Sequence, residues 1–412
     1  MISVPARRAE AGDAILGVWP QSVLEPSRLE EAGEILREAA TGGKALAFAG
    51  GGTQLELGTA PERLDLLVRT SGLRRIVEYS PSDQVVVAEA GLTLADLQRE
   101  LGAHGQRLAL DPPRPERATL GGIVAANAWG PRRARYGSVR DLLIGVSFFR
   151  ADGVLARGGG KVVKNVAGFD MPRLLIGSLG TLGLVATTTF RLHPVAEADS
   201  TLWVGDCSPR DVREMVRRIR EAQLEPAAAL AIGSDPARFD LAVRFEGFDA
   251  GVAQQVARLR ELSAGERRAC EVLAEDSARA LWQRHDALRS EPALRAKFCA
   301  PPDSFERLAS GILPPLFEAV SGAACLWHPT LGVGFVSGGA ESSEATAAAL
   351  QSARAVLAGL GGTLTLEAAP AELRRRVHVW GPPPASLPLM RRVKERFDPE
   401  RRLAPGRFVG GI

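Results

Sequence analysis

Cysteine is scarce in this chain, and its few copies lie far apart. The 412 residues include four cysteines and no C-x-x-C pair. An iron–sulfur cluster needs several thiolates close together, and structural zinc sites and disulfide frameworks also show characteristic spacings. We therefore expect inert thiols, and neither a cluster nor a disulfide scaffold, at Cys207, Cys270, Cys299 and Cys325.

Long hydrophobic runs and a strong charge of one sign are also missing. The longest apolar run, Leu142–Phe149, has the length of a strand, well short of the roughly 18 residues of a membrane span. The start, Met1–Asp13, lacks the apolar stretch of a signal peptide. The formal net charge is +3, which gives no electrostatic footprint for nucleic acid. We expect a cytoplasmic protein with no transmembrane segment; attachment to the inner membrane through partners stays open.

The hydrophobic pattern predicts an α+β fold of two parts. Helical spacing of Leu29, Ala32, Leu36 and Ala39 follows a capping-box pattern from Ser27 to Glu30, and short strands surround this helix. From residue 201 onward, strands and helices alternate in two halves around a mainly helical stretch, which indicates an antiparallel sheet covered by helices. We expect domains at 1–195 and 196–380, with 381–412 returning to the first.

A run of glycines follows a short apolar strand in the first part of the chain. Glycine permits positive φ and close approach of a ligand to the backbone, and successive N–H groups can converge on a diphosphate. We assign a binding role to the residues of this loop, Ala49, Gly50, Gly51, Gly52, Thr53 and Gln54. A tight turn that ends the strand explains the same glycines about as well.

Two further segments between residues 111 and 185 are rich in small residues. In the second segment, small residues let the backbone approach a flat ring, while Thr119 and Asn127 offer hydrogen bonds and Arg140 a charge for a phosphate. Its candidate residues are Pro112, Thr119, Gly121, Gly122, Ala125, Asn127, Gly137 and Arg140. A surface pair with Asp141 is the alternative role for Arg140. The third segment contributes Lys164, Gly183 and Val185, and a solvated lysine is the alternative at Lys164.

The three segments, in this order and spacing, resemble the FAD-binding domain of the vanillyl-alcohol oxidase (PCMH-type) superfamily. The resemblance covers about residues 20–195, and the ending Phe397–Arg407 is similar to the closing segment of that family, with Ala404 where Asn is usual. It implies a two-subdomain FAD-binding domain followed by an antiparallel cap. Lys164–Asp170 and Gly177–Gly183 are more narrowly similar to the FAD-binding subunits of glycolate oxidases.

The departures from the family pattern shape the expected chemistry. Thr53 stands where covalent members place a histidine, and no cysteine lies in the second or third segment, so we expect non-covalent FAD. Catalytic 2-hydroxyacid dehydrogenases of the superfamily use two histidines of the cap to help bind a metal. Here His328 keeps the first position but Phe335 takes the second, and the other histidines are scattered along the sequence. We therefore predict no metal site and assign no catalytic residue.

The resemblance implies an FAD-dependent oxidoreductase acting on CH–OH groups: the FAD-binding subunit of a complex that oxidises glycolate to glyoxylate. The implied partners are a catalytic FAD subunit and an iron–sulfur subunit, with a small 2-hydroxy acid as substrate. Two alternatives stay open. One is a self-sufficient FAD-dependent 2-hydroxyacid dehydrogenase, and the other is a non-catalytic subunit that uses FAD for electron relay or structure.

Overall fold

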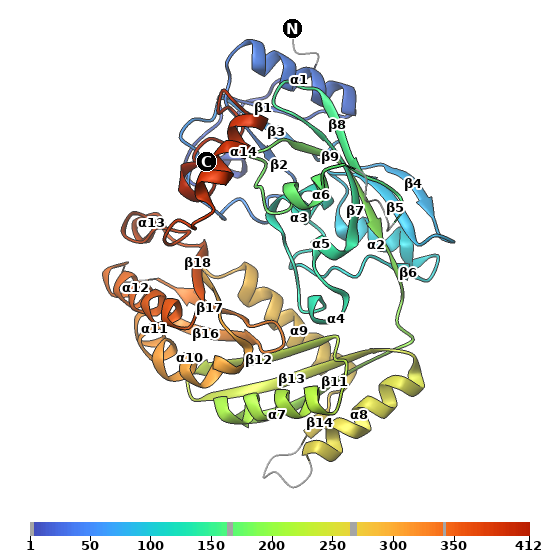
Figure 1. Ribbon diagram of the computed structural model, residues 1–412, viewed down its shortest axis with the longest axis vertical. Coiled ribbons are helices and arrows are strands. Elements are labelled where there is room, and N and C mark those ends of the chain that lie inside the picture. Colours follow the sequence, from blue (N-terminus) through green and yellow to red (C-terminus); the bar gives the residue numbers. More distant parts are fainter. Residues whose placement is uncertain (1–3, 163–167, 264–269, 341–342) are drawn as a thin grey trace. The chain divides into compact units, whose positions relative to one another are not determined.

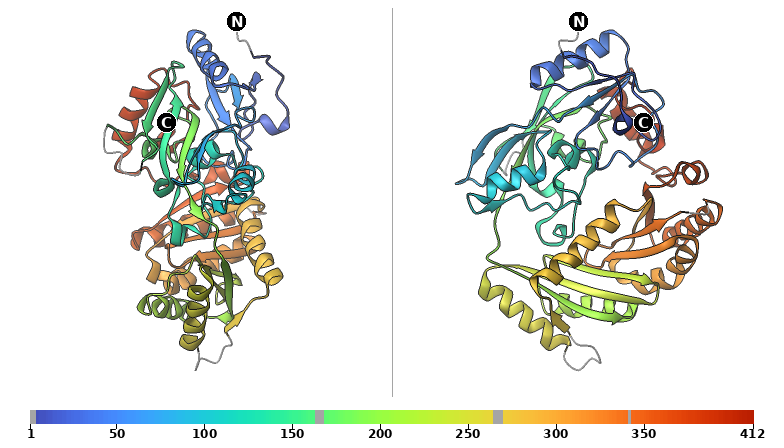
Figure 2. Two further views of the ribbon diagram at one scale, coloured as in Figure 1. Left: turned by 90° about the vertical axis from the view of Figure 1, so that its right-hand side faces the viewer. Right: turned by 180° about the vertical axis from the view of Figure 1, so that it is seen from behind.

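The computed structural model describes residues 4–162, 168–263, 270–340 and 343–412 (Figures 1 and 2). The chain forms two compact units. Unit 1 comprises Met1–Trp129, Gly137–Pro194 and Pro383–Ile412, and unit 2 comprises Gly130–Tyr136 and Val195–Pro382. Helices and sheets occur in both units, which confirms the predicted α+β class.

The first sheet of unit 1 has three parallel strands in the order β1-β3-β2, namely β1 (Ser22–Leu24), β3 (Leu66–Arg69) and β2 (Leu46–Ala49). Helix α1 (Leu29–Thr41) lies between β1 and β2 in the chain, and Ile35 and Ala39 pack with strand residues in one core. Its capping contacts differ from the predicted Ser27–Glu30 box: Glu31 accepts hydrogen bonds from Ser27 and from the Arg28 N–H. Helix propensity alone could not fix the boundary to one residue.

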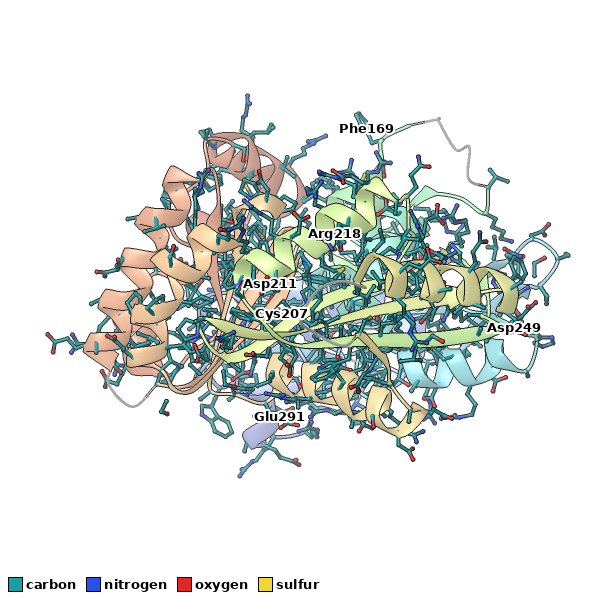
Figure 3. All side chains as sticks on the ribbon, turned by 90° about the horizontal axis from the view of Figure 1, so that it is seen from below. Phe169, Cys207, Asp211, Arg218, Asp249 and Glu291 are labelled. Carbon is teal, nitrogen blue, oxygen red and sulfur yellow. The ribbon has the colours of Figure 1, made fainter. Side chains whose placement is uncertain are left out.

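The second sheet of unit 1 is antiparallel and has five strands in the order β4-β5-β9-β7-β8. These are β4 (Ile76–Ser80), β5 (Val85–Glu89), β9 (Leu184–Arg191), β7 (Leu143–Phe149) and β8 (Leu155–Gly159). The helices of this part are α2 (Leu94–Gly102), α3 (Leu120–Ala126), α5 (Val139–Leu142) and α6 (Met171–Leu175). A two-stranded ladder pairs β6 (Gln106–Arg107) with β10 (His193–Pro194). Phe169, just before α6, is 90% exposed and points outward (Figure 3).

The C-terminal segment is part of unit 1. Helix α14 (Leu387–Phe397) is followed by a turn, and Leu403 then forms a parallel bridge with Leu46 of β2. The Lys394 ammonium is buried and donates to the Asp398 carboxylate at 2.7 Å and to the carbonyls of Thr181 and Leu403 at 2.8 Å each. These contacts fasten the end of the chain to the loop before β9.

Unit 2 contains one eight-stranded antiparallel sheet in the order β14-β11-β13-β12-β16-β17-β15-β18. The strands are β11 (Ala198–Cys207), β12 (Ala228–Asp235), β13 (Arg238–Gly247), β14 (Cys270–Val272), β15 (Leu294–Cys299), β16 (Ser321–His328), β17 (Val333–Gly339) and β18 (Thr363–Ala368). Its helices are α4 (Arg133–Tyr136), α7 (Pro209–Glu221), α8 (Asp249–Ser263), α9 (Glu275–Ser290), α10 (Phe305–Gly311), α11 (Leu313–Ala319), α12 (Ser343–Gly359) and α13 (Ala371–Arg376). Helices α7 and α8 lie over one face of the sheet, and α9 lies over the other (Figures 1 and 3).

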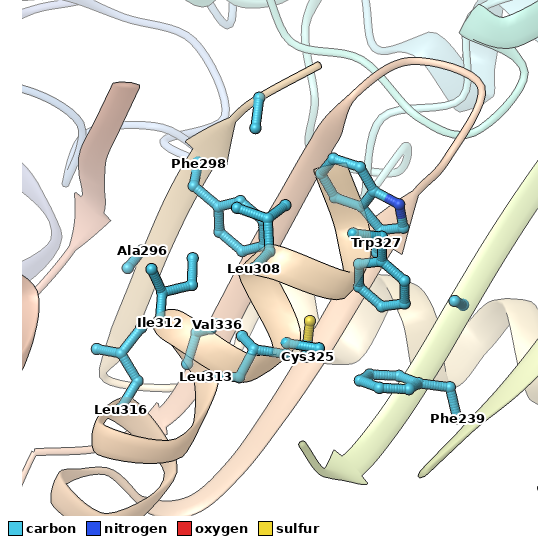
Figure 4. Packing of buried hydrophobic residues seen from close by; sticks show 14 of the residues in the cluster. Phe239, Ala296, Phe298, Leu308, Ile312, Leu313, Leu316, Cys325, Trp327 and Val336 are labelled. Carbon is cyan, nitrogen blue, oxygen red and sulfur yellow. The ribbon is translucent and has the colours of Figure 1, made fainter. Parts of the chain in front are cut away.

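Aromatic side chains fill the core of unit 2 on the face opposite α9. Trp327 of β16 stacks on Phe298 of β15 and on Phe305 of α10, with ring centroids 5.8 and 5.4 Å apart (Figure 4). Cys325 is fully buried in the same cluster, and burial raises the pKa of its thiol, which keeps it protonated and unreactive. Because side chains alternate along a strand, His328 points to the α9 face.

Segment Gly130–Tyr136 belongs to unit 2 because it is held by a buried carboxylate. Glu246 of β13 is buried, and its side chain accepts from Arg132 at 2.8 Å and from the Tyr136 hydroxyl at 3.3 Å. Arg135 donates to the Glu246 carbonyl, and Arg244 lies 3.1 Å from the carboxylate. These ionic contacts could not be predicted, since Arg132 and Glu246 are 114 positions apart.

Candidate functional site

A cleft in unit 1 brings parts of all three predicted segments together. Its walls come from β2 and the loop after it, from α3, from the start of β9 and from the chain's end. The lining residues are Ile15, Ala47, Phe48, Ala49, Gly50, Gly51, Gly52, Thr53, Gln54, Leu55, Thr70, Ala90, Thr119, Gly121, Gly122, Ala125, Ala126, Leu179, Gly180, Gly183, Leu184, Val185 and Arg407.

The first glycine loop packs directly against the second segment. A Cβ added to Gly50 would lie 2.0 Å from the Thr119 hydroxyl oxygen, and one added to Gly51 would lie 1.7 Å from the Arg117 carbonyl oxygen. Gly52 has φ +75°, a conformation that side chains rarely adopt. A side chain at Gly51 would therefore strike the neighbouring backbone.

The second segment forms α3 and the residues that cap it. The Thr119 hydroxyl caps the start of α3 by accepting from the Gly122 N–H at 3.3 Å. A Cβ on Gly121 would lie 2.6 Å from the Ala90 methyl carbon, so glycine is needed for α3 to pack near the end of β5. Asn127 ends the helix in the left-handed region, at φ 49°.

Two buried polar atoms next to the cleft lack a partner in the described protein. They are Asn127 Oδ1, at the end of α3, and Ser178 Oγ, in the loop before β9. Backbone hydrogen bonds from Gly177 to Val124 and from Leu179 to Ala125 hold this loop against α3. Buried polar groups are normally hydrogen-bonded, so these two atoms are candidates for contacts with a cofactor.

The third segment reaches the cleft through its glycines. Gly183 has φ +159°, and a Cβ there would lie 2.6 Å from the Phe149 carbonyl oxygen; Gly180 has φ +76° against the Phe48 ring. These positions bring Leu179 and Val185 into the wall. Lys164, which we assigned to the same site, lies outside the described residues.

Several predicted residues do not line the cleft. Pro112 is buried elsewhere in unit 1, and Gly137 has φ +85° with the Asp141 side chain where its Cβ would be. Arg140 is exposed on α5, and its backbone N–H bonds to the Ser138 hydroxyl. The contribution of these three residues to cofactor binding stays a prediction.

The sequence reasoning missed Arg407 as a site residue. It is buried, lines the cleft, and donates through Nη2 to the carbonyls of Leu55 and Leu57 at 3.2 and 2.7 Å. The family resemblance of the closing segment, Phe397–Arg407, is the available signal in the sequence. That resemblance gave no reason to place its arginine beside residues 350 positions away.

Unit 2 holds a second polar cluster, on the α9 face of the sheet. His285 of α9 and His328 of β16 are both buried, and their Nε2 atoms are 3.3 Å apart. His285 Nδ1 lies 2.8 Å from Asp286 Oδ1, and the Arg289 guanidinium lies 4.2 Å from the centre of the Phe335 ring. Phe335 thus supports a cation–π contact in the position where the family has its second histidine.

The fold thus brings together two histidines that lie far apart in the sequence. Burial is the main cause that holds the pKa of His285 and of His328 well below the usual value, and the positive charge of Arg289 adds to it. Burial raises the pKa of Asp286 to about 6. Within the described residues, no group of three or more His, Cys, Asp or Glu side chains is arranged to hold a metal ion.

The cleft suits a large flat cofactor that carries a phosphate group. Its walls are mostly small or apolar, glycine backbone is exposed at several points, and three threonine hydroxyls and a glutamine amide offer hydrogen bonds. None of its described lining residues is histidine or cysteine, the residues that could attach a flavin covalently. The fold and the cleft together fit a flavin-binding protein.

Comparison with known proteins agrees with this class. Residues 20–159 match the family described as FAD binding domain. Glycolate oxidase subunit GlcE of Escherichia coli (strain K12) is 36% identical over 198 residues, which cover 47% of this chain and 53% of GlcE. The chain therefore aligns with about half the length of that relative. D-lactate dehydrogenase of Archaeoglobus fulgidus is 28% identical over 421 residues, 94% of this chain and 91% of that protein.

Solved structures show the same fold. p-Cresol methylhydroxylase with substrate bound superposes with a TM-score of 0.72 at 15% identity, covering 94% of this chain and 88% of that one. Alkyldihydroxyacetonephosphate synthase gives 0.71 at 15% identity, covering 95% and 78%. The sequence matches support an FAD-dependent oxidoreductase with FAD as its cofactor, and the solved structures show its fold. In the described residues, no helix is long and apolar enough to cross a membrane.

Proposed function

We propose that this chain is the FAD-binding subunit of a glycolate oxidase complex, in which glycolate is oxidised to glyoxylate. The observation that carries the proposal is the cleft, in which parts of three sequence segments and the C-terminal arginine meet. The similarity to GlcE, at 36% identity over 198 residues, supports the choice of glycolate. FAD supplies the capacity to accept a hydride from the carbon that bears the hydroxyl group.

The residues of the cleft would hold and shield this cofactor. Small side chains and glycine backbone at Gly121, Gly122 and Ala125 allow a flat ring to approach closely. Asn127 Oδ1 and Ser178 Oγ, which are buried and have no partner among the described residues, would form hydrogen bonds with its polar edge. The apolar residues Leu179, Leu184 and Val185 would keep water from one part of the cleft.

A partner is needed for onward electron transfer under this proposal. The four cysteines are free in the structure and come from separate elements, and Cys207 and Cys325 are buried. The thiols of this chain therefore give no support for an iron–sulfur cluster within it. Under the proposal, an iron–sulfur subunit would accept the electrons, and a second FAD subunit would complete the complex.

The test is purification of the chain with its natural partners, followed by glycolate-dependent reduction of an artificial acceptor. The proposal predicts co-purification of an iron–sulfur protein and turnover of glycolate by the complex. A complex that forms but oxidises D-lactate or 2-hydroxyglutarate and leaves glycolate untouched would contradict the substrate. A chain that purifies alone and turns over a 2-hydroxy acid would contradict the subunit role.

A self-sufficient 2-hydroxyacid dehydrogenase is the second candidate. The alignment with the D-lactate dehydrogenase over 94% of the chain favours it, because that relative matches almost from end to end. The cluster in unit 2 also contains a cation, Arg289, and two neutral imidazoles, the kinds of group that orient a carboxylate and accept a proton. Burial of His285 and His328 speaks against direct contact with substrate. Glycolate and D-lactate turnover by the isolated chain decides between the two.

A further inference from the structure

Arg407 is the sole charged side chain among the described residues that line the FAD cleft. Every other described lining residue is glycine, apolar, or a neutral hydroxyl or amide. FAD, in contrast, carries a diphosphate with negative charge on both phosphates. An anion placed in a cleft with apolar walls needs a cation or aligned donors, because it loses much of its hydration there.

Hydrogen bonds with backbone groups hold both the guanidinium and the main chain of Arg407 in place. Its Nη2 donates to the carbonyls of Leu55 and Leu57, and its own carbonyl accepts from the Thr59 N–H at 3.1 Å. All three partners directly follow the first glycine loop. The guanidinium is thus tied to the same end of the cleft as the loop whose N–H groups were predicted to receive a phosphate.

Other candidates for a phosphate-binding cation fit less well. Arg140 is exposed on α5 and does not line the cleft. Arg117 lies close to the first loop, where its Nη2 donates to the Gly51 carbonyl at 2.9 Å, but it is exposed and also absent from the lining. Helix α3 has seven residues, too few for its dipole to take the place of a full charge.

We propose that Arg407 binds the diphosphate of FAD, so that the last segment of the chain completes a cofactor site begun by the first glycine loop. The Arg407 guanidinium keeps its charge at every physiological pH, and its nitrogens other than Nη2 can donate charge-assisted hydrogen bonds to phosphate oxygens. The proposal concerns the cofactor alone and holds whichever substrate the protein oxidises.

The test compares three ligands on the full chain after its flavin has been removed: FAD, ADP and riboflavin. ADP carries the diphosphate without the flavin ring, and riboflavin carries the ring without phosphate. We expect Arg407→Gln to raise the Kd for FAD and for ADP roughly 10- to 100-fold, the usual effect of losing a charged hydrogen bond. The Kd for riboflavin should change less than about threefold. Thermal unfolding of each ligand-free variant measures any loss of fold.

Arg117→Gln is the matched control, since it removes the same charge from an arginine that also bonds a carbonyl of this region. It should leave the Kd for ADP within about threefold of the wild-type value. Arg407→Lys keeps the charge but not the paired donors, so an intermediate Kd for ADP is expected. If Arg407→Gln fails to fold, the lysine variant carries the same comparison of ADP with riboflavin.

Three results would overturn the proposal. Unchanged ADP affinity in folded Arg407→Gln shows that the arginine does not meet the diphosphate. An equal loss of ADP and riboflavin affinity shows that Arg407 acts only by holding Leu55 and Leu57 in place, which supports the whole cleft. A selective loss of riboflavin affinity places the guanidinium beside the ring.

Discussion

His285 Nε2 lies 3.3 Å from His328 Nε2, although 43 positions separate the two residues. At neutral pH Asp286 is mostly ionised and accepts a hydrogen from His285 Nδ1, which lies 2.8 Å from Asp286 Oδ1. Both imidazoles are then neutral, as their burial requires.

This pair predicts that unit 2 loses stability in mild acid. The pKa of each histidine is lowered in the folded protein, so below the unfolded value of about 6.5 the unfolded chain binds more protons. Below that pH, each histidine lowers the free energy of unfolding by about 1.4 kcal/mol for every unit by which the pH falls. The pKa of Asp286 is raised to about 6, so below pH 6 the folded protein binds a proton at Asp286 and regains part of the lost stability. Solvent screening makes this gain smaller, because the Asp286 side chain is 42% exposed. His285→Gln should flatten the slope.

Urea unfolding followed by tryptophan fluorescence, between about pH 7 and pH 5, measures these slopes. His378→Gln, at an exposed position, is the control and should keep the wild-type pH dependence. Equal slopes in the wild type and the His285→Gln variant would contradict the buried neutral pair.

Gly51→Ala tests whether the first loop is fixed by packing. The added methyl carbon would lie 1.7 Å from the Arg117 carbonyl oxygen, so the two segments must separate, and we expect a loss of about 1–3 kcal/mol or more together with weaker FAD binding. Gly102→Ala, where nothing lies within 4 Å, should leave both quantities unchanged. A fully stable Gly51→Ala protein that loses flavin would restore the idea that this position faces the ligand.

Lys394→Met tests the fastening of the C-terminal segment. The variant leaves the buried Asp398 carboxylate without its cation and removes the donors to Thr181 and Leu403, so unit 1 should lose roughly 3–5 kcal/mol. FAD content should fall too, because Arg407 lies on the same segment. The exposed Lys44→Met serves as control. Wild-type urea unfolding and full flavin content in Lys394→Met would show that the contact is dispensable.

Acid precipitation tests the mode of flavin attachment. Since none of the described residues lining the cleft is histidine or cysteine, all of the yellow colour should pass into the supernatant when the holoprotein is denatured. The absorbance of pellet and supernatant measures the outcome. Colour that stays with the precipitated chain would mean a covalent bond to a residue outside the described lining.

The predictability of this site from sequence depends on how local each signal is. The glycines at 50–52 and 121–122 can be recognised in the sequence, because backbone geometry and close packing require several glycines within a few positions. No local sequence pattern identifies Arg407 or His285 as a functional residue. Each acquires its role from a contact across the fold, Arg407 with Leu57 and His285 with His328. Neither helical nor strand periodicity encodes such pairs.

Anaerobic reduction of the bound flavin shows whether FAD in this chain takes part in glycolate oxidation. Glycolate is added without oxygen to the complex purified through this chain, and the yellow flavin absorbance is followed. We expect the absorbance to fall by the amount due to the flavin of this chain plus that of its partner, and to return when an acceptor is added. Flavin of this chain that stays oxidised with glycolate, D-lactate and 2-hydroxyglutarate alike would contradict it.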